Sequence, residues 1–552
     1  MRPKQGCSRT GRRHRWHRLL PLGAVAVFIL LPAPGQTAAF AVDKSANPPA
    51  RLRAISLTVL EDKIRGGWAG QMIGVAYGTA DEFHYQHKIN EGSLPWVPGM
   101  VSVALEQDDL YVEMSFAEVL DRQGLNATTR QLGEAFRQTR FGVCHGNAGA
   151  RRLLDSGYAA PLSGDPRLNI HVNDIDFQIE ADFIGLMSPG LPLQALDYAT
   201  RTGRVMAHGD GLYGGIFVSA MYAAAFFESD PRTVIEQALA SIPSGSNHAR
   251  AIRDVLQWSR EFPDDWRHTW RLLEDKWDFA GSCPDEAGSP FNIQASLNAA
   301  YVVMGLLYGR GDFARTLEIT TRSGQDSDSN PSIAGGVIGT VLGYSALPDT
   351  WKSGIPPIAD KPFNYTNYSY NDIVESTIRR AILAIRFGGG RLSADTAYVP
   401  EQQAVAAPLE NWTMGRPVTI IPTDGHEWRL QGNWQTTIAD PARFCGPLFN
   451  YQLTSAGNAT ASLDFNGNSV ALVGVRSPKG GKADLYVDGN FAAQIDFYVR
   501  KDTTDTDLWH SNALRPGMHH LELRARNDRN PDSMGNELAL GRAILYDGAI
   551  TD

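Results

Sequence analysis

The sequence predicts a multidomain protein with an all-α domain followed by a C-terminal antiparallel β-sandwich of jelly-roll-like type. Its 552 residues are too many for a single hydrophobic core. Apolar residues recur at helical spacing from about residue 56 to residue 390, and alternation with a period of two then takes over. A content of 43% hydrophobic and 20% charged residues excludes a wholly disordered or fibrous chain.

The first 41 residues have the features of a secretory signal peptide. Seven Arg or Lys residues and no acid precede the apolar run 19–31, and the small-residue stretch 37–41 follows it. Cleavage after Ala41 would leave residues 42–55 as an N-terminal tail of a secreted, extracellular protein. The apolar run is too short to cross a bilayer, and no other run approaches about 20 residues, so no membrane span is expected.

Charge and cysteine content argue against several kinds of partner and site. Loss of the seven basic residues leaves 44 of the 51 Lys and Arg residues against 60 Asp and Glu, so no nucleic acid partner is expected. The remaining cysteines, Cys144, Cys283 and Cys445, form an odd and sparse set without CxxC spacing. This pattern argues against a disulfide framework and a cysteine zinc site, and it leaves open one bridge between Cys144 and Cys283.

Helical periodicity predicts the elements of residues 56–390. Apolar residues three to four apart predict a first helix that contains Trp68 and Met72. Glycine pairs at 66–67 and 335–336 predict close contacts between helices. A last helix, about 371–387, ends at three consecutive glycines, which are a stop signal. Other helices are predicted near 109–120, 193–201, 212–227, 295–308 and 332–344.

The C-terminal part is predicted to consist of a linker at 391–420 and a sandwich at 421–552. Asp488-Gly489 and Asn466-Gly467 have the composition of hairpin turns. Roughly 130 residues with short alternating segments are typical of an antiparallel β-sandwich. Strands are predicted at 461–465, 469–475, 483–487, 493–497 and 520–525.

Three distant stretches of the helical region carry carboxylates next to predicted helix ends. Any one of these acids alone is explained as a helix cap, because free N–H groups and the helix dipole favour negative charge there. Together they crowd several negative charges unless a cation lies among them. Hard divalent ions such as Mg²⁺, Mn²⁺ or Ca²⁺ prefer oxygen ligands of this kind. The stretches contribute Glu82, Asp108, Asp109, Asp326, Asp328 and Ser329.

These stretches resemble motifs of the ADP-ribosylglycohydrolase family. GGWAGQMIGVAYGTADEF, QDD and SGQDSDSNPSIAGGVIGTVLGY occur in the family's order within about residues 58–390. The resemblance implies a compact helical domain that holds one or two Mg²⁺ or Mn²⁺ ions and hydrolyses the bond at the anomeric carbon of a ribofuranose. It implies metal ligation by Asp108, Asp109, Asp326, Asp328 and Ser329, with Glu82 or Asp109 as the catalytic acid or base.

The chain departs from the family at two places. Gln107 and Leu110 stand where Thr is usual, and Gln can ligate a metal through its carbonyl whereas Leu cannot. In place of a Gly-rich loop that contacts ADP-ribose, the chain has residues 173–190, where acids such as Asp174 and Asp176 would repel a diphosphate. Carboxylates accept hydrogen bonds from neutral sugar hydroxyls, so this segment favours an uncharged glycan. A solvated helix face is the other explanation of these acids.

Several polar residues are candidates for contacts with the substrate. The segment 207–215 begins a predicted helix and can line the same site, although a histidine next to glycine is more often structural. His145 and Asn147 form a similar and weaker candidate pair. The predicted substrate-binding residues are Gln107, Asn173, Asp174, Asp176, His208, Asp210 and Tyr213.

The predicted sandwich resembles galactose-binding-like, carbohydrate-binding modules that are appended to secreted glycosidases. Its resemblance lies in the stretch SVALVGVRSPKGGKADLYVDG. Trp428, Trp434 and Trp509 are either sugar-binding platforms or, more commonly, part of a core.

The sequence therefore predicts a secreted, metal-dependent glycoside hydrolase that acts on a furanosyl or other extracellular glycan. One alternative is an ADP-ribosyl hydrolase that acts on a modified protein or small molecule. A second alternative is a non-catalytic, glycan-binding protein. The stereochemical outcome and the oligomeric state are left open.

Overall fold

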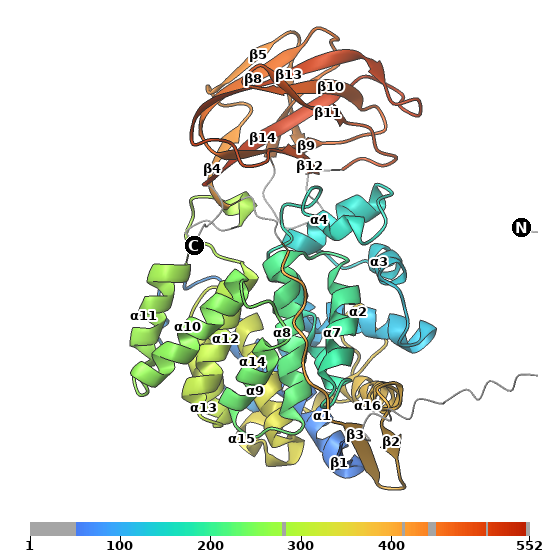
Figure 1. Ribbon diagram of the computed structural model, residues 1–552, viewed down its shortest axis with the longest axis vertical. Coiled ribbons are helices and arrows are strands. Elements are labelled where there is room, and N and C mark those ends of the chain that lie inside the picture. The colour runs from blue at the N-terminus through green and yellow to red at the C-terminus, as the bar shows by residue number, and fades with distance from the viewer. Residues whose placement is uncertain (1–50, 279–282, 411–414, 440–448, 504–505, 548–552) are drawn as a thin grey trace, which may run out of the picture. The chain divides into compact units, whose positions relative to one another are not determined.

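A computed structural model describes residues 51–278, 283–410, 415–439, 449–503 and 506–547. These ranges form a helical region followed by a region of antiparallel sheets (Figure 1), which confirms the predicted fold class. The predicted signal peptide lies outside them.

The described part of the helical region contains sixteen α-helices. Helices α1, α2, α7, α8, α12, α14 and α16 are the counterparts of segments predicted from periodicity. The helices are α1 (Leu57–Gly78), α2 (Asp108–Gln123), α3 (Thr129–Gln138), α4 (His145–Asp155), α5 (Asp176–Ile179), α6 (Asp182–Leu186), α7 (Pro192–Gly203), α8 (Gly209–Ala225), α9 (Pro231–Leu239), α10 (Asn247–Glu261), α11 (Trp266–Trp277), α12 (Ala295–Gly309), α13 (Phe313–Arg322), α14 (Ser329–Leu342), α15 (Asp349–Lys352) and α16 (Tyr370–Phe387).

Local signals set the ends of the first and last helices. At the start of α1, Ser56 Oγ accepts a hydrogen bond of 3.2 Å from the backbone N–H of Val59. Helix α16 begins with a capping box between Ser369 and Asp372 and ends before Gly388, as the glycine run predicts.

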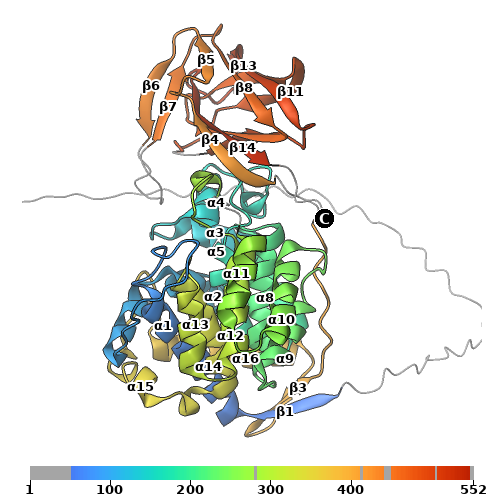
Figure 2. The same ribbon diagram turned by 90° about the vertical axis from the view of Figure 1, so that its left-hand side faces the viewer.

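A small antiparallel sheet joins the two ends of the helical region. Strand β1 (Leu52–Ser56) pairs with β3 (Thr396–Pro400), which also pairs with β2 (Arg391–Leu392). Figure 2 shows β1 and β3 side by side. These strands lie in stretches that we expected to be tail and linker, where they are too short for a clear alternating pattern.

Residues 401–410 form an extended strap that follows β3 (Figure 1). Gln402 Oε1 accepts from the N–H of Leu193, and the N–H of Ala407 donates to the carbonyl of Ser241 at 2.9 Å. At its end, Tyr213 Oη donates to the carbonyl of Pro408 at 3.0 Å. The strap is therefore hydrogen-bonded to the helical region along its length.

Two antiparallel sheets form the C-terminal domain. Their orders are β11-β10-β13-β8-β5 and β12-β9-β14-β7-β6, with β4 on β14. Leucines from both sheets, such as Leu463, Leu485, Leu472 and Leu540, share one buried cluster, so the sheets pack face to face. The strands are β4 (Arg416–Pro422), β5 (Trp428–Gln431), β6 (Gln435–Ala439), β7 (Phe449–Thr454), β8 (Thr460–Gly467), β9 (Ser469–Val475), β10 (Gly481–Val487), β11 (Asn490–Asp496), β12 (Thr506–His510), β13 (Gly517–Arg529) and β14 (Leu538–Asp547).

One predicted hairpin is confirmed and the other is wrong. Asp488 and Gly489 have φ angles of 51° and 76° and join β10 to β11 as a two-residue turn. Asn466 and Gly467 instead remain within β8, paired with β13, and the chain then enters β9 of the other sheet. Because both residues keep an extended conformation, they do not form a turn. The chain passes from one sheet to the other after them.

Helices α1 and α14 are in contact through their backbones. Glycines at successive turns of α1 face α14: a Cβ on Gly70 would lie 2.0 Å from the carbonyl oxygen of Gly335, and one on Gly74 would lie 2.0 Å from that of Pro331. No side chain larger than hydrogen fits at these positions. The predicted glycine contacts between helices are thus confirmed for this pair.

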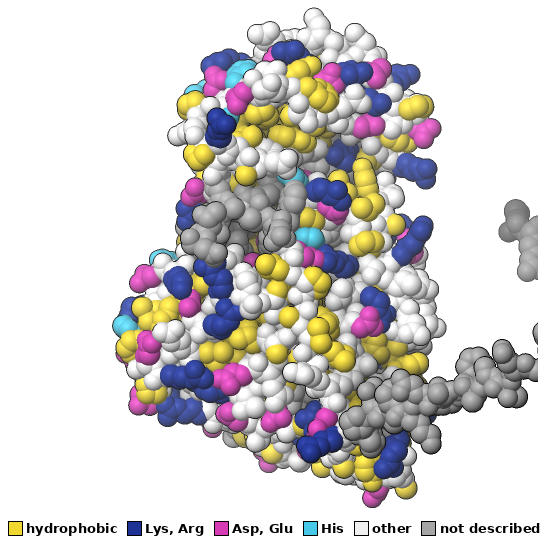
Figure 3. Space-filling view, in the orientation of Figure 1, with side chains coloured by type: hydrophobic (Ala, Val, Ile, Leu, Met, Phe, Trp, Pro, Cys, Tyr) yellow, Lys and Arg dark blue, Asp and Glu magenta, His cyan; other side chains and the backbone are white. Residues whose placement is uncertain are grey.

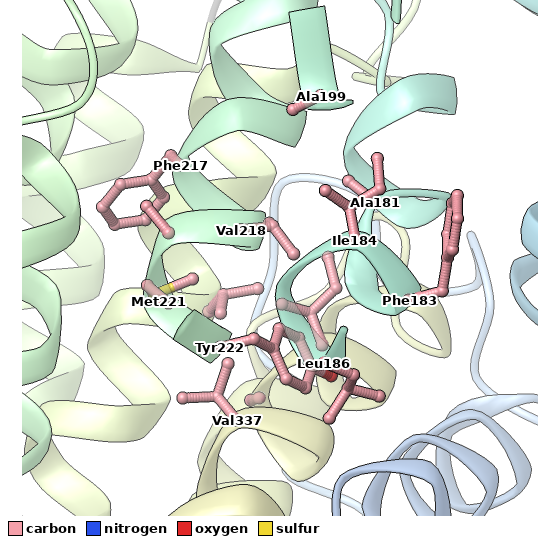
Figure 4. Close-up of a cluster of buried hydrophobic side chains, with 14 of the residues drawn as sticks. Ala181, Phe183, Ile184, Leu186, Ala199, Phe217, Val218, Met221, Tyr222 and Val337 are labelled. Atoms are coloured by element: carbon pink, nitrogen blue, oxygen red, sulfur yellow. The ribbon is translucent and has the colours of Figure 1, made fainter. Parts of the chain in front are cut away.

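The core beside this pair is built from α6, α8 and α14. Figure 4 shows Tyr222 of α8 next to Leu186 of α6 and Val337 of α14. Gly336 makes room for this tyrosine, because a Cβ there would lie 1.6 Å from the Tyr222 oxygen.

Basic and acidic side chains are interspersed on the face seen in Figure 3. Within the described ranges, none of the helices combines the length and apolarity required to cross a bilayer.

The α1–α14 contact makes a testable prediction. The Gly74→Ala substitution forces a methyl group against the Pro331 carbonyl and should lower the free energy of unfolding by about 3 kcal/mol. Gly99→Ala is the matched control, because a Cβ at Gly99 meets nothing within 4 Å. Urea unfolding of both variants measures the difference; equal stabilities would contradict the close contact.

Candidate metal-binding and catalytic site

The α1–α14 contact continues into the loops that carry two of the acidic stretches. At the last turn of α1, a Cβ on Gly78 would lie 1.8 Å from the carbonyl oxygen of Ser327. Beyond α1, the N–H of Phe83 donates to the carbonyl of Gln325 at 2.9 Å, and the N–H of Gln325 donates to that of Tyr85 at 3.0 Å. Gly324, with φ of 87°, allows this approach. Glu82 and Asp326 are thereby held next to each other.

Oxygens from all three acidic stretches meet in one cluster, which we call the carboxylate cluster. Carboxylate oxygens of Glu82, Asp326 and Asp328 lie within 4.8 Å of one another. Ser329 Oγ donates to Asp109 Oδ2 at 3.3 Å, which joins α14 to α2. Glu82 and Asp108 are exposed to solvent, whereas Asp109, Asp326, Asp328 and Ser329 are buried. The cluster therefore opens to solvent on one side.

The carboxylates of the cluster raise one another's pKa. Partial desolvation of its carboxyl by the surrounding protein, followed by the charges of Asp326 and Asp108, raises the pKa of Glu82 to about 7. Burial and the neighbouring carboxylates also hold the pKa values of Asp109 and Asp328 well above their ordinary range. Asp109 Oδ1 is buried and finds no hydrogen-bond donor among the described residues. A divalent cation would remove these electrostatic costs, so the cluster fits the metal that the motifs imply.

The two residues that replace Thr in the motif have different environments. Gln107 Nε2 donates to Thr79 Oγ1 at 3.3 Å, so its amide links the start of α2 to the end of α1. Leu110 is fully buried in the hydrophobic core. The Leu110 position therefore contributes packing to the helical domain in place of an oxygen ligand.

A second layer of acids lies beneath the cluster and was missed from the sequence. Glu113 is fully buried one turn after Asp109, and its Oε2 accepts from the N–H of Phe183 at 2.8 Å. Asp182 accepts from Tyr222 Oη and lies close enough to raise the pKa of Asp109. The i to i+4 spacing of Asp109 and Glu113 on one helix face was the available signal.

The acids of segment 173–182 are bonded within the protein. Asp176 accepts from the N–H groups of Gly146 and Asn147, each at 3.0 Å. Asp174 Oδ2 lies 2.9 Å from His171 Nδ1, and Glu180 accepts from Asn147 Nδ2. These contacts give the acids a structural role. The acids are therefore no longer evidence against a charged substrate such as a diphosphate. Half-buried Asn173 accepts from the N–H of Ala295 through its carbonyl at 3.1 Å.

Of the remaining predicted substrate residues, His208 and Tyr213 contact the strap and Asp210 contacts the start of α10. Glu410 of the strap contacts His208 Nε2 at 3.1 Å and also pairs with Arg204. Tyr213 bonds to the strap at Pro408 and at the N–H of Glu410, and Asp210 accepts from the N–H of His248 at 3.0 Å. Their observed contacts are with the strap and neighbouring helices rather than with the carboxylate cluster.

The tryptophans and cysteines also have observed environments. Trp428 is buried in the sandwich core, and Trp434 and Trp509 pack against it. Cys283 has a free, buried thiol, whereas Cys144 is disulfide-bonded. The Cys144 to Cys283 bridge that the sequence left open is therefore not formed, and the Cys283 Sγ lies 3.6 Å from His145 Nδ1 instead. Cys445 lies outside the described residues.

Asp328 tests whether the cluster binds a metal or only caps a helix. Asp328→Asn keeps a side chain that can cap α14 but removes a charge, and it should weaken Mg²⁺ or Mn²⁺ binding at least about tenfold in titration calorimetry. Asp312→Asn is the matched control, because Asp312 caps α13 through a 2.7 Å bond away from the cluster. Equal metal affinities of the two variants would refute the metal site.

The raised pKa values predict how metal binding depends on pH. A carboxyl such as Glu82, with its pKa raised from 4.5 to about 7, stabilises the metal-free fold at low pH and loses that contribution as the pH rises through 7. Metal competes with these protons. The increase in melting temperature on addition of Mn²⁺ should therefore be larger at about pH 8 than at about pH 5.5. A pH-independent increase would contradict proton–metal competition.

Three solved structures illustrate what the chain is similar to. The structure of an ADP-ribosylglycohydrolase-related protein complex is 15% identical, with a TM-score of 0.37, and the match covers 59% of this chain and 99% of that chain. A carbohydrate-binding module CBM36 in complex with calcium and xylotriose is 17% identical, with a TM-score of 0.16, over 23% and 98% of the two chains. A family two carbohydrate esterase from Cellvibrio japonicus is 16% identical, with a TM-score of 0.17, over 23% and 32%. A comparison with curated proteins finds no match.

The helical region also matches a family profile. The profile of the ADP-ribosylglycohydrolase family matches residues 56–383, which is more than half of the chain. All three acidic stretches of the carboxylate cluster lie within this match. The chain belongs to the ADP-ribosylglycohydrolase family.

Proposed function

We propose that this protein is an exported hydrolase that uses divalent metal to cleave a glycosyl bond at the anomeric carbon of a furanosyl or other extracellular glycan. Family membership supports a hydrolase of glycosyl bonds. The observation that carries the metal-dependent mechanism is the convergence of oxygens from Glu82, the Asp108–Asp109 doublet and residues 326–329.

The proposed metal ligands are the oxygens of the carboxylate cluster. Buried Asp109 has an oxygen without a partner in the described part of the chain, and Asp326 and Asp328 lie within reach of a shared ion. When bound, Mg²⁺ or Mn²⁺ supplies positive charge that lowers the pKa of water and stabilises negative charge that develops in the reaction. The proposed ligand set is Asp108, Asp109, Asp326, Asp328 and Ser329.

Glu82 is the proposed general acid or base. Its carboxyl is exposed, lies next to Asp326 and Asp328, and is not in the proposed ligand set, so it is free to exchange a proton with water or substrate beside the metal. Asp109, the other candidate, is buried and accepts from Ser329, which suits a ligand better than a proton carrier. Glu82 would accept a proton from the attacking water or donate one to the leaving oxygen.

Two features support export and a glycan substrate. The N-terminal sequence combines seven basic residues, an apolar run and small residues, as secretory signals do. The C-terminal sandwich has its own hydrophobic core and lies outside the residues that the family profile matches.

An ADP-ribosyl substrate is the second candidate. It is favoured by the family and by the burial of Asp176 and Glu180, whose oxygens accept hydrogen bonds inside the protein and do not form an exposed acidic surface toward a diphosphate.

Activity assays separate the candidates. Furanosyl chromogenic glycosides and an ADP-ribosylated peptide are incubated with the full chain and Mg²⁺ or Mn²⁺, and each reaction is repeated with chelator. The proposal expects turnover of the furanosides that chelator abolishes. Turnover of the peptide alone would support the second candidate, and glycan binding without turnover of either would support a binding protein.

Substitution of Glu82 tests its role. Glu82→Gln should lower kcat at least about 100-fold, because an amide does not exchange a proton, while metal still binds. Glu261→Gln, at the exposed end of α10, is the control and should keep full activity. Wild-type kcat in Glu82→Gln would exclude Glu82 as the acid or base.

A further inference from the structure

A second group of metal-ligating side chains shares no residue with the carboxylate cluster. His145, His171, Asp174 and Cys283 each offer one ligand atom, and these four atoms lie within 4.8 Å of one another. Asp174 Oδ2 lies 2.9 Å from His171 Nδ1 and 3.9 Å from His145 Nδ1. We propose that these four side chains bind one zinc ion, at a site distinct from that of the Mg²⁺ or Mn²⁺ ions.

The donor atoms suit zinc rather than magnesium or manganese. One sulfur, two imidazole nitrogens and one carboxylate oxygen form a mixed set that Zn²⁺ binds tetrahedrally, whereas Mg²⁺ requires oxygen ligands. With Zn–N near 2.1 Å and Zn–S near 2.3 Å, a tetrahedral site places N and S about 3.6 Å apart. The observed separation of His145 Nδ1 and Cys283 Sγ is 3.6 Å. On binding, the 3.9 Å separation of His145 Nδ1 from Asp174 Oδ2 would shorten and the 2.9 Å separation of His171 Nδ1 from Asp174 Oδ2 would lengthen, each by about 0.5 Å.

Charge balance supports the same ion. Cys283 would bind as a thiolate, with its proton released to solvent, and Asp174 binds as a carboxylate. Together with two neutral imidazoles they neutralise Zn²⁺, so the occupied site has no net charge, as a buried site requires. Cys283 and Asp174 are buried, and the side chain of His145 is 22% exposed, which gives the ion a route of entry.

The surroundings of the group orient its imidazoles. Asp285 Oδ2 lies 3.4 Å from His171 Nε2, on the side of the ring opposite the Nδ1 that faces Asp174. A carboxylate that accepts from the second ring nitrogen fixes the tautomer of a zinc-bound histidine. The ring of His145 stacks on Phe291, with centroids 5.7 Å apart.

The position of the group predicts a structural role. Its ligands come from the start of α4, from the loop before α5 and from Cys283. Four protein ligands leave no open coordination position, which is typical of structural zinc. Phe291 also contacts Phe83, the neighbour of Glu82, at 4.8 Å. Zinc would therefore hold together three segments next to the carboxylate cluster.

Metal analysis and cobalt spectroscopy of the full chain test the proposal. Wild-type protein exposed to Zn²⁺ and dialysed should retain about one zinc per chain. Co²⁺ in its place should give the near-ultraviolet band of a cobalt–thiolate bond. Cys283→Ser should lose that band and most of the zinc, whereas Asp328→Asn should keep both and lose Mg²⁺ or Mn²⁺ binding.

Three results would overturn the proposal, and two of them need no variant. Wild-type protein that retains no zinc, or that binds Co²⁺ without a thiolate band, excludes the site whether or not Cys283→Ser folds. Zinc lost in Asp328→Asn but kept in Cys283→Ser would place the ion in the carboxylate cluster instead. None of these results depends on hydrolytic activity.

Discussion

The backbone contact between α1 and α14 is the constraint on which the site depends. Glycine at positions 70, 74 and 78 of α1 lets successive turns approach the α14 backbone and the loop before it. Because this stripe runs to the last residue of α1, it fixes the start of α14 and the loop after α1 at the same time. The pairing of Phe83 with Gln325 then completes the approach of Glu82 to Asp326. The geometry of the carboxylates thus follows from how two helices pack.

The carboxylate cluster and the acids beneath it bring more negative charge together than the neighbouring side chains neutralise. Asp109, Asp328 and Glu113 are buried close together, and burial raises the pKa of each. Nearby, the His145, His171, Asp174 and Cys283 group mixes nitrogen, sulfur and oxygen donors. The two groups therefore differ in the hardness of their ligands, since the carboxylate cluster offers only oxygen atoms.

Periodicity and motifs predicted the two-domain architecture, most long helices and the acidic stretches, because each is encoded by a local pattern. Three kinds of feature could not be predicted from periodicity or motifs. Asn466-Gly467, where the chain passes from one sheet to the other, has the composition of a turn. The two residues instead belong to strand β8, because they pair with β13, which is distant in the sequence. The acids of segment 173–182 were interpreted as sugar-binding groups or as a solvated helix face, but Asp176 bonds to backbone groups of α4 that only the tertiary fold brings near. The group around Cys283 joins residues more than a hundred positions apart, without the short spacing that marks a zinc motif.

The strap has a consequence for separating the two domains. Residues 401–410 bond to Leu193, Ser241 and Tyr213, and β3 before them pairs with β1. A chain that ended at Gly390, the last glycine of the helical region, would lose the strap contacts and the pairing of β1 with β3. It would also lose part of the wall of a cavity of roughly 430 Å³ that Arg53 and the strap line. An autonomous catalytic fragment must therefore retain the strap up to Glu410, and any natural exchange of the sandwich for another module would have its recombination point after this residue.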